Sequence, residues 1–136
     1  MPSAIQGIAE IVLMVRDLQA ALAFYHDTLG LEVISPAAMQ GPVFLRVGPP
    51  GTGVPSQIVL VPRPATAADL PGDRRLRSMH HVGLELAAPD LAAERERLTG
   101  LGFQVRTGQH PFLPVEAIYV DDPDGNEVEL VAWTGS

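Results

Sequence analysis

The feature that most constrains the fold of this chain is an internal repeat. The stretches VRDLQAALAFYHDTLGLEV (residues 15–33) and AAPDLAAERERLTGLGFQV (residues 87–105) follow the same pattern. Each begins a helix at Asp-Leu, where the aspartate can accept hydrogen bonds from the free N–H groups of the first turn. Each of the two helices is expected to end in Leu-Gly, and glycine readily adopts the left-handed conformation that closes a helix. Matching caps and helix lengths indicate two copies of one structural unit.

Strands are predicted around both helices, one before each helix and three after it, from runs of apolar residues that alternate with polar ones. The first strand after each helix starts directly behind the Leu-Gly pair, at residues 31–33 and 103–105. The other strands cover residues 9–15, 43–47, 57–61, 80–86, 116–120 and 126–132. The sequence DDPDGN between the last two is a turn, because proline presets φ and glycine tolerates a positive φ. The order is βαβββ, repeated. We therefore predict an α+β fold in which two βαβββ modules face a common open cleft.

The two modules are expected to span about residues 7–61 and 78–133 of a single domain that covers residues 1–136. The segment 62–77 is rich in Pro, Ala and Asp and is interpreted as a linker. A chain of 136 residues is long enough to bury one usable core.

Composition narrows the classes of function. Nine Lys and Arg stand against 16 Asp and Glu, a net charge of −7, and the longest basic cluster is DRRLR at residues 73–77. Nucleic-acid binding is disfavoured, because a phosphate backbone requires a basic patch. No apolar run approaches the ~20 residues of a membrane span, and no secretory signal pattern is present, so a cytoplasmic location is expected. Cysteine is absent, so any metal must be held by His, Asp or Glu.

Strand alternation places three ionisable residues on comparable faces. In the strands 9–15, 80–86 and 126–132, one face is wholly apolar and is expected to pack under a helix. The opposite faces carry Glu10, His81 and Glu129. An imidazole and carboxylates that converge from separate strands are suitable ligands for a divalent metal ion, which would also relieve the repulsion between the two carboxylates. Each of the three residues could instead be an ordinary solvated or hydrogen-bonded side chain.

Several other residues have structural interpretations. His80 alternates onto the apolar face and is expected to be structural, and Tyr25 belongs to the apolar stripe of its helix. His26 is expected to face solvent, and His110, in the loop GQHPFLP, is interpreted as a surface histidine or a lid residue. The orientation of Arg46 and Tyr119 relative to the cleft is left open. The chain has neither a phosphate-binding glycine loop nor a serine nucleophile motif.

Three stretches together resemble the vicinal oxygen chelate superfamily, which includes glyoxalase I, extradiol dioxygenases, fosfomycin- and bleomycin-resistance proteins, and methylmalonyl-CoA epimerase. They are VRDLQAALAFYHDTLGLEV, HHVGLEL and YVDDPDGNEVEL. In glyoxalase-like members four strand positions hold the metal. By this resemblance those positions are Glu10, Val59, His81 and Glu129, and valine cannot ligate a metal ion.

The resemblance implies a metal-dependent enzyme that acts on a small substrate with neighbouring oxygens. Glu10, His81 and Glu129 would hold a divalent ion, with Mn, Ni, Zn, Fe or Mg equally compatible. Glu10 or Glu129 would move a proton, and one histidine with two glutamates favours a lyase or isomerase over a dioxygenase. The alternative is a metal-free small-molecule binding protein of the bleomycin-resistance type. A homodimer is expected, because members of this superfamily commonly pair.

Overall fold

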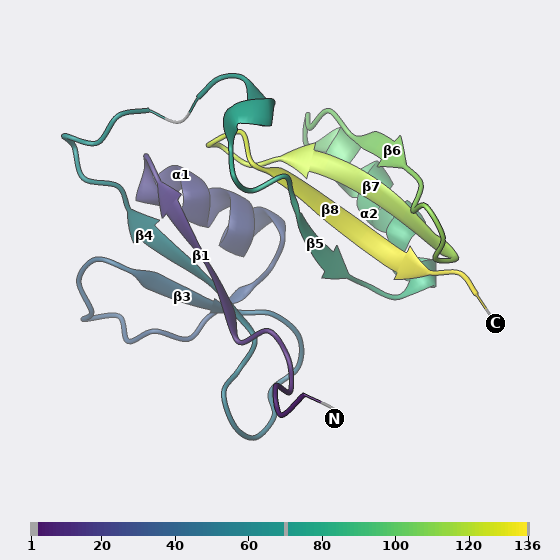
Figure 1. Ribbon diagram of the computed structural model, residues 1–136, viewed down its shortest axis with the longest axis horizontal. Helices are drawn as coiled ribbons and strands as arrows, with labels where there is room; N and C mark the ends of the chain where they lie inside the picture. Colours follow the sequence, from purple (N-terminus) through teal and green to yellow (C-terminus); the bar gives the residue numbers. More distant parts are fainter. Residues whose placement is uncertain (1–2, 70, 136) are drawn as a thin grey trace. The chain divides into compact units, whose positions relative to one another are not determined.

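The computed structural model describes residues 3–69 and 71–135. The chain divides into two compact units, Met1–Ala68 and Asp69–Ser136 (Figure 1). The boundary between the units falls inside the segment predicted as a linker. Within the described ranges, no helix is both long and apolar enough to cross a membrane.

The first unit is a four-stranded sheet with one helical segment. Its elements are β1 (Glu10–Val15), α1 (Leu18–Leu22), which continues as the π-helical segment η1 (Ala23–Thr28), β2 (Glu32–Val33), β3 (Val43–Arg46) and β4 (Gln57–Pro62). The strand order is β1-β4-β3-β2. β1 pairs with β4 in parallel, and the other pairs are antiparallel.

The second unit repeats this topology. Its elements are the 3₁₀ turn η2 (Arg74–Leu76), β5 (Val82–Glu85), α2 (Ala88–Gly100), β6 (Arg106–Gly108), β7 (Val115–Asp121) and β8 (Glu127–Trp133). The order β5-β8-β7-β6 again has one parallel pair, β5 with β8. Two βαβββ modules of the α+β class are therefore confirmed.

The helix boundaries follow the sequence signals with one exception. The Asp17 side chain caps α1 by accepting a hydrogen bond from the Ala20 N–H at 3.1 Å, as predicted. The prediction that Asp90 caps the second helix is wrong: α2 starts at Ala88, and Asp90 lies inside its first turn. Proline at the first helical positions explains the earlier start, because its fixed φ suits a helix and its missing N–H needs no partner there. Gly30 and Gly102 close the helices with φ of 78° and 95°.

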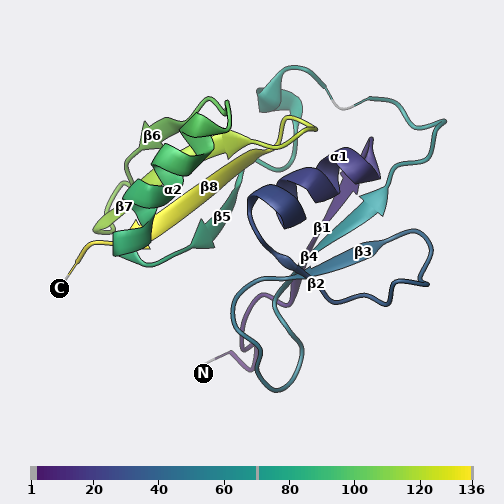
Figure 2. The same cartoon turned by 180° about the vertical axis from the view of Figure 1, so that it is seen from behind.

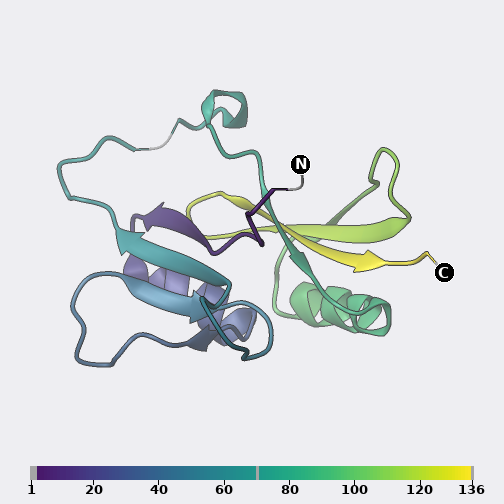
Figure 3. The ribbon, with the colours of Figure 1, turned by 60° about the horizontal axis from the view of Figure 1, so that its bottom comes forward.

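In each unit the helix lies across one face of the sheet (Figures 2 and 3), and the strand side chains on that face are buried. In the first unit, the fully buried side chains come from both the sheet and the helix: Val15, Leu45, Leu60, Ala21 and Tyr25. In the second unit, the helix residues Leu91 and Leu98 are buried together with strand residues that share one face of the sheet. These strand residues are Val82, Ile118, Val120, Val128, Leu130 and Ala132. Burial of one face in each sheet leaves only the other face for charged groups.

The turn between β7 and β8 is held by a buried aspartate. The Asp122 carboxylate accepts hydrogen bonds from the Asp124 N–H at 2.9 Å, from the Asn126 N–H at 2.8 Å and from the Asn126 side-chain amide at 2.9 Å. Gly125 takes the positive φ, 80°, that the turn requires. This turn sets the register at which β8 returns along β7, and thereby the positions of the glutamates on β8.

Leu98 and Leu101 form a matched pair for a test of the second core. Leu98 is fully buried, whereas Leu101 at the end of the same helix is 58% exposed. Leu98→Ala is expected to lower the free energy of unfolding by about 2–5 kcal/mol, since it leaves a cavity, and Leu101→Ala by less than about 1 kcal/mol. Urea denaturation measures the free energy of unfolding of each variant. The fluorescence of Trp133, the only tryptophan, reports on the second unit. Equal effects of the two substitutions would contradict the assigned core.

Candidate functional site

The face of the second sheet that points away from α2 carries a polar row that crosses three strands. Gly83 on β5 lies opposite Glu129 on β8, and Glu129 lies opposite Tyr119 on β7. The neighbours of Glu129 along β8, Val128 and Leu130, are buried on the helix side. Side chains alternate between the faces of a strand, so the Glu129 and Tyr119 side chains lie on the face away from α2.

Gly83 provides the space that the Glu129 carboxylate occupies. A Cβ atom placed on Gly83 would lie 2.9 Å from Oε1 of Glu129, closer than such atoms approach in proteins. Any larger residue at this position would displace the end of the glutamate side chain. The absence of a side chain at position 83 therefore lets the carboxylate lie over the parallel pair of β5 and β8.

Tyr119 holds the other oxygen of the same carboxylate. Its hydroxyl donates a hydrogen bond to Oε2 of Glu129 at 2.5 Å. This bond, together with burial and the negative charges of Glu129 and Glu127, raises the pKa of Tyr119 to about 12. The phenol stays protonated at neutral pH and remains a donor. Tyr119 is therefore part of the polar row, which resolves the orientation that the sequence left open.

His81 lies next to this row. It is exposed, it directly precedes β5, and its ring stands edge-to-face to that of Tyr119 with centroids 6.0 Å apart. His81, Tyr119 and Glu129 thus gather in one patch of the second unit. An imidazole beside a fixed carboxylate can ligate a metal ion or transfer a proton.

The prediction that His80 packs on the apolar face is wrong. β5 begins only at Val82, so strict alternation does not extend back to the two histidines. His80 is exposed, and its Nδ1 lies 2.8 Å from Nδ1 of His81. The two adjacent rings therefore meet edge to face just before the strand, with their centroids 5.0 Å apart.

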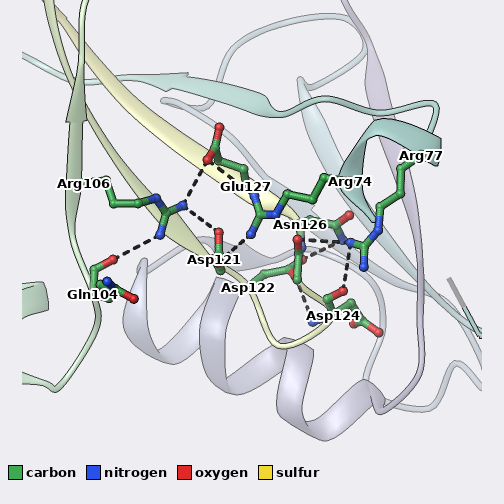
Figure 4. A network of polar contacts seen from close by, with 10 residues as sticks. Arg74, Arg77, Gln104, Arg106, Asp121, Asp122, Asp124, Asn126 and Glu127 are labelled. Atoms are coloured by element: carbon green, nitrogen blue, oxygen red, sulfur yellow. Dashed lines mark hydrogen bonds and ion pairs between the residues drawn. The ribbon is translucent and has the colours of Figure 1, made fainter. Parts of the chain in front are cut away.

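A compact ionic cluster borders the patch (Figure 4). Asp121 accepts from Arg74 at 2.6 Å and from Arg106 at 2.7 Å, and Glu127 is 3.1 Å from Arg106 and 3.4 Å from Arg74. Partial burial works against ionisation of Asp121, but hydrogen bonds from the two guanidinium groups outweigh it and hold its pKa below the usual value. The two carboxylates and two guanidinium groups balance one another, so the cluster itself carries no net charge.

The strands of the first unit pair in the same register as those of the second, but the row equivalent to the polar row has apolar side chains. Its parallel pair places Val12 opposite Val59, and Val59 lies opposite Phe44. In the repeat this row corresponds to Gly83, Glu129 and Tyr119. Val59 therefore stands at the position equivalent to Glu129, as the family resemblance indicated, and the row has no metal ligand.

Glu10 is the remaining predicted ligand. It is exposed at the start of β1, opposite Gln57, and corresponds in the repeat to His81. Glu10 belongs to the first unit, while His81 and Glu129 belong to the second. The structure thus brings His81 and Glu129 into one patch, and their meeting with Glu10 stays a prediction.

The other singled-out residues have local roles. Tyr25 is fully buried in the first core, as expected. His26 is exposed, with Nδ1 2.7 Å from the carbonyl oxygen of Leu31. Nδ1 of His110 accepts hydrogen bonds from two N–H groups of its own loop, at 3.1 and 2.9 Å, which gives this histidine a part in loop structure. Arg46 forms an ion pair with Glu32 on the neighbouring strand.

Comparison with known proteins identifies the family. Residues 7–130 match the profile of the Glyoxalase/Bleomycin resistance protein/Dioxygenase superfamily. The chain belongs to this superfamily. The resemblance found in the sequence is thereby confirmed over nearly the whole chain.

Individual relatives show how varied this superfamily is. The chain is 26% identical over 121 residues to a catechol-2,3-dioxygenase of Bacillus subtilis, and it spans 39% of that protein's length. A glyoxalase/dioxygenase from Nostoc punctiforme has the same fold, with a TM-score of 0.75 at 17% identity over 99% of this chain and 96% of that one. Lactoylglutathione lyase from Agrobacterium tumefaciens aligns with a TM-score of 0.71 at 23% identity, over 96% of both chains.

The pairing of Tyr119 with Glu129 has a direct titration test. Tyr119 is expected to ionise at about pH 12, and Glu129→Gln should bring its pKa back toward the unperturbed value of 10 because the charged acceptor is removed. Since the folded-state pKa is raised, the stability from this contact is present below about pH 10 and is lost as the pH rises through 12. The difference in phenolate absorbance between wild type and Tyr119→Phe isolates this tyrosine. An unchanged titration in Glu129→Gln would contradict the hydrogen bond.

Proposed function

We propose that this protein is a metal-dependent enzyme that acts on a small substrate with vicinal oxygens, with Glu10, His81 and Glu129 as metal ligands. The observation that carries the proposal is the Glu129 carboxylate. It lies over Gly83, accepts a hydrogen bond from Tyr119 and shares with His81 the sheet face that points away from α2. One imidazole and two carboxylates suit the divalent ions Mn, Ni, Zn, Fe and Mg.

The residues of the second unit have distinct roles in this proposal. Tyr119 occupies Oε2 of Glu129, which leaves Oε1, the oxygen above Gly83, as the ligating atom. Such a hydrogen bond fixes the orientation of a ligand and raises metal affinity. A bound divalent ion supplies Lewis acidity toward two neighbouring substrate oxygens and so favours loss of a proton from the adjacent carbon.

Glu10 is the better candidate for moving that proton. It is exposed and has no side-chain hydrogen bond to the other described residues, whereas the Glu129 carboxylate is tied to Tyr119. A carboxylate within reach of a carbon acid serves as a general base. We therefore propose a reaction of the lyase or isomerase type. Ring cleavage by oxygen, the activity in the name of the catechol-2,3-dioxygenase relative, is the competing enzymatic outcome.

A metal-free binding protein is the second candidate function, and the first unit favours it. The first unit has an apolar row at the strand positions that are equivalent to the polar row of the second unit; it consists of Val12, Val59 and Phe44. Val12 is half exposed, so part of this surface is open to an apolar ligand. In this alternative the glutamates attract a cationic small molecule, as the net charge of −7 also favours.

Assembly and location complete the proposal. Members of the superfamily bind small-molecule substrates and often form dimers, so we propose that this protein is a homodimer. We also propose a cytoplasmic location, as the sequence patterns lead us to expect. Sedimentation velocity of the purified protein distinguishes a dimer of the 14.5 kDa chain from a monomer.

Metal analysis decides between the two candidate functions. After incubation with Mn, Ni, Zn and Fe(II) salts and gel filtration, the wild type is expected to retain one equivalent of a divalent ion. His81→Ala, Glu129→Gln and Glu10→Gln should each lower the affinity roughly 10-fold or more, because each removes a ligand. His26→Ala is the control, since His26 lies outside the proposed ligand set. Failure of the wild type to bind any of these ions would sink the enzyme and favour the binding protein.

Gly83→Ala tests the seat of the Glu129 carboxylate. The added methyl group must displace Oε1, so metal affinity is expected to fall by roughly 10-fold or more. The free energy of unfolding should change by less than about 1 kcal/mol, because the displaced atom is the end of a flexible side chain. Gly100→Ala is the matched control, since no atom lies within 4 Å of a Cβ placed there. Undiminished metal binding in Gly83→Ala would remove Glu129 from the ligand set.

A further inference from the structure

Three side chains that are able to ligate a metal ion lie together where β5 and β8 begin. His80, His81 and Glu127 each offer one ligand atom, and these atoms all lie within 4.8 Å of one another. All three residues belong to the second unit, so the group depends on no contact with the first. Both histidines are exposed, and Glu127 is half-buried.

The spacing of the two histidines fits a particular coordination geometry. Two nitrogen ligands bound to one ion at about 2.0–2.1 Å lie about 2.9 Å apart when they meet at a right angle and about 3.3 Å apart in a tetrahedron. The observed separation between the two Nδ1 atoms is 2.8 Å. It matches adjacent positions of a square or octahedral site, the geometry that Cu(II) and Ni(II) prefer. Exposed rings change rotamer rapidly, so both lone pairs can turn toward a common point.

The carboxylate of Glu127 needs only a small adjustment to join them. Two ligand atoms on opposite sides of one ion are about 4.2 Å apart. The ligand atoms of His80, His81 and Glu127 all lie within 4.8 Å of one another, so the largest of these separations needs to shorten by well under 1 Å. Glu127 holds its two arginines at 3.1 and 3.4 Å, whereas Asp121 holds the same arginines at 2.7 and 2.6 Å. Asp121 can therefore keep both guanidinium groups paired while Glu127 turns toward a cation.

We propose that His80, His81 and Glu127 form a binding site for a divalent transition-metal ion of the Cu(II) or Ni(II) type, separate from the site formed by Glu10, His81 and Glu129. Neither Glu10 nor Glu129 takes part in it. The two sites share His81, so an ion bound by His80 and His81 competes with the proposed catalytic ion for this ring. Excess Cu(II) is then an inhibitor of the proposed enzyme.

Copper titration of the full chain tests the site directly. The wild type is expected to bind a first equivalent of Cu(II) whose electron paramagnetic resonance spectrum shows two nitrogen ligands. His80→Gln should leave one nitrogen and weaken binding roughly 10-fold or more, and Glu127→Gln should weaken binding while both nitrogens remain. Glu129→Gln and the control His26→Gln should match the wild type. Circular dichroism checks that each variant is folded.

The opposite pattern overturns the proposal. If His80→Gln keeps the two-nitrogen spectrum and the wild-type affinity, His80 is not a ligand. If Glu129→Gln loses the copper signal and His80→Gln does not, copper occupies the site proposed for catalysis. The test is also separable from the proposed function: His80→Gln should still retain Mn, Zn or Fe(II) in the metal analysis, whereas Glu129→Gln should lose it.

Discussion

The parallel pairing of β5 with β8 is the constraint on which the candidate site depends. Its register sets Gly83 opposite Glu129, and the missing side chain at position 83 leaves room for the carboxylate above the sheet. The antiparallel pairing of β8 with β7 then brings Tyr119 to the other side of the same glutamate. A shift of one residue in either pairing would turn Glu129 into the core beneath α2, where no partner for its charge is available.

The same scaffold carries opposite chemistry in the two modules. The row that contains Gly83, Glu129 and Tyr119 in the second module corresponds to Val12, Val59 and Phe44 in the first. Backbone pairing is equivalent in both, so the difference comes entirely from side chains. The second module therefore presents a hydrogen-bonded carboxylate, and the first presents an apolar surface with Glu10 at its edge.

The segment interpreted as a linker has a structural role in the second unit. The Arg77 guanidinium donates to the carbonyl oxygens of Pro71 at 2.8 Å and of Gly125 at 3.1 Å, and so ties this segment to the turn between β7 and β8. Arg74, from the same segment, joins the ionic cluster with Asp121 and Glu127. The basic cluster at residues 73–77 thus serves internal pairing, and this pairing leaves the region next to His80 and His81 without excess positive charge.

The amino-acid sequence by itself determined the duplicated βαβββ architecture, the superfamily, and the strand faces of Glu10, Val59 and Glu129. These follow from local rules, since alternation, helix caps and glycine turns depend only on neighbouring residues. Tertiary structure decided the rest. The hydrogen bond of Tyr119 to Glu129, the space above Gly83 and the pairing of His80 with His81 depend on which residues of different strands lie opposite each other, and on where β5 begins. Strand register and strand ends are set by packing across the sheet, and no local pattern in the sequence contains them.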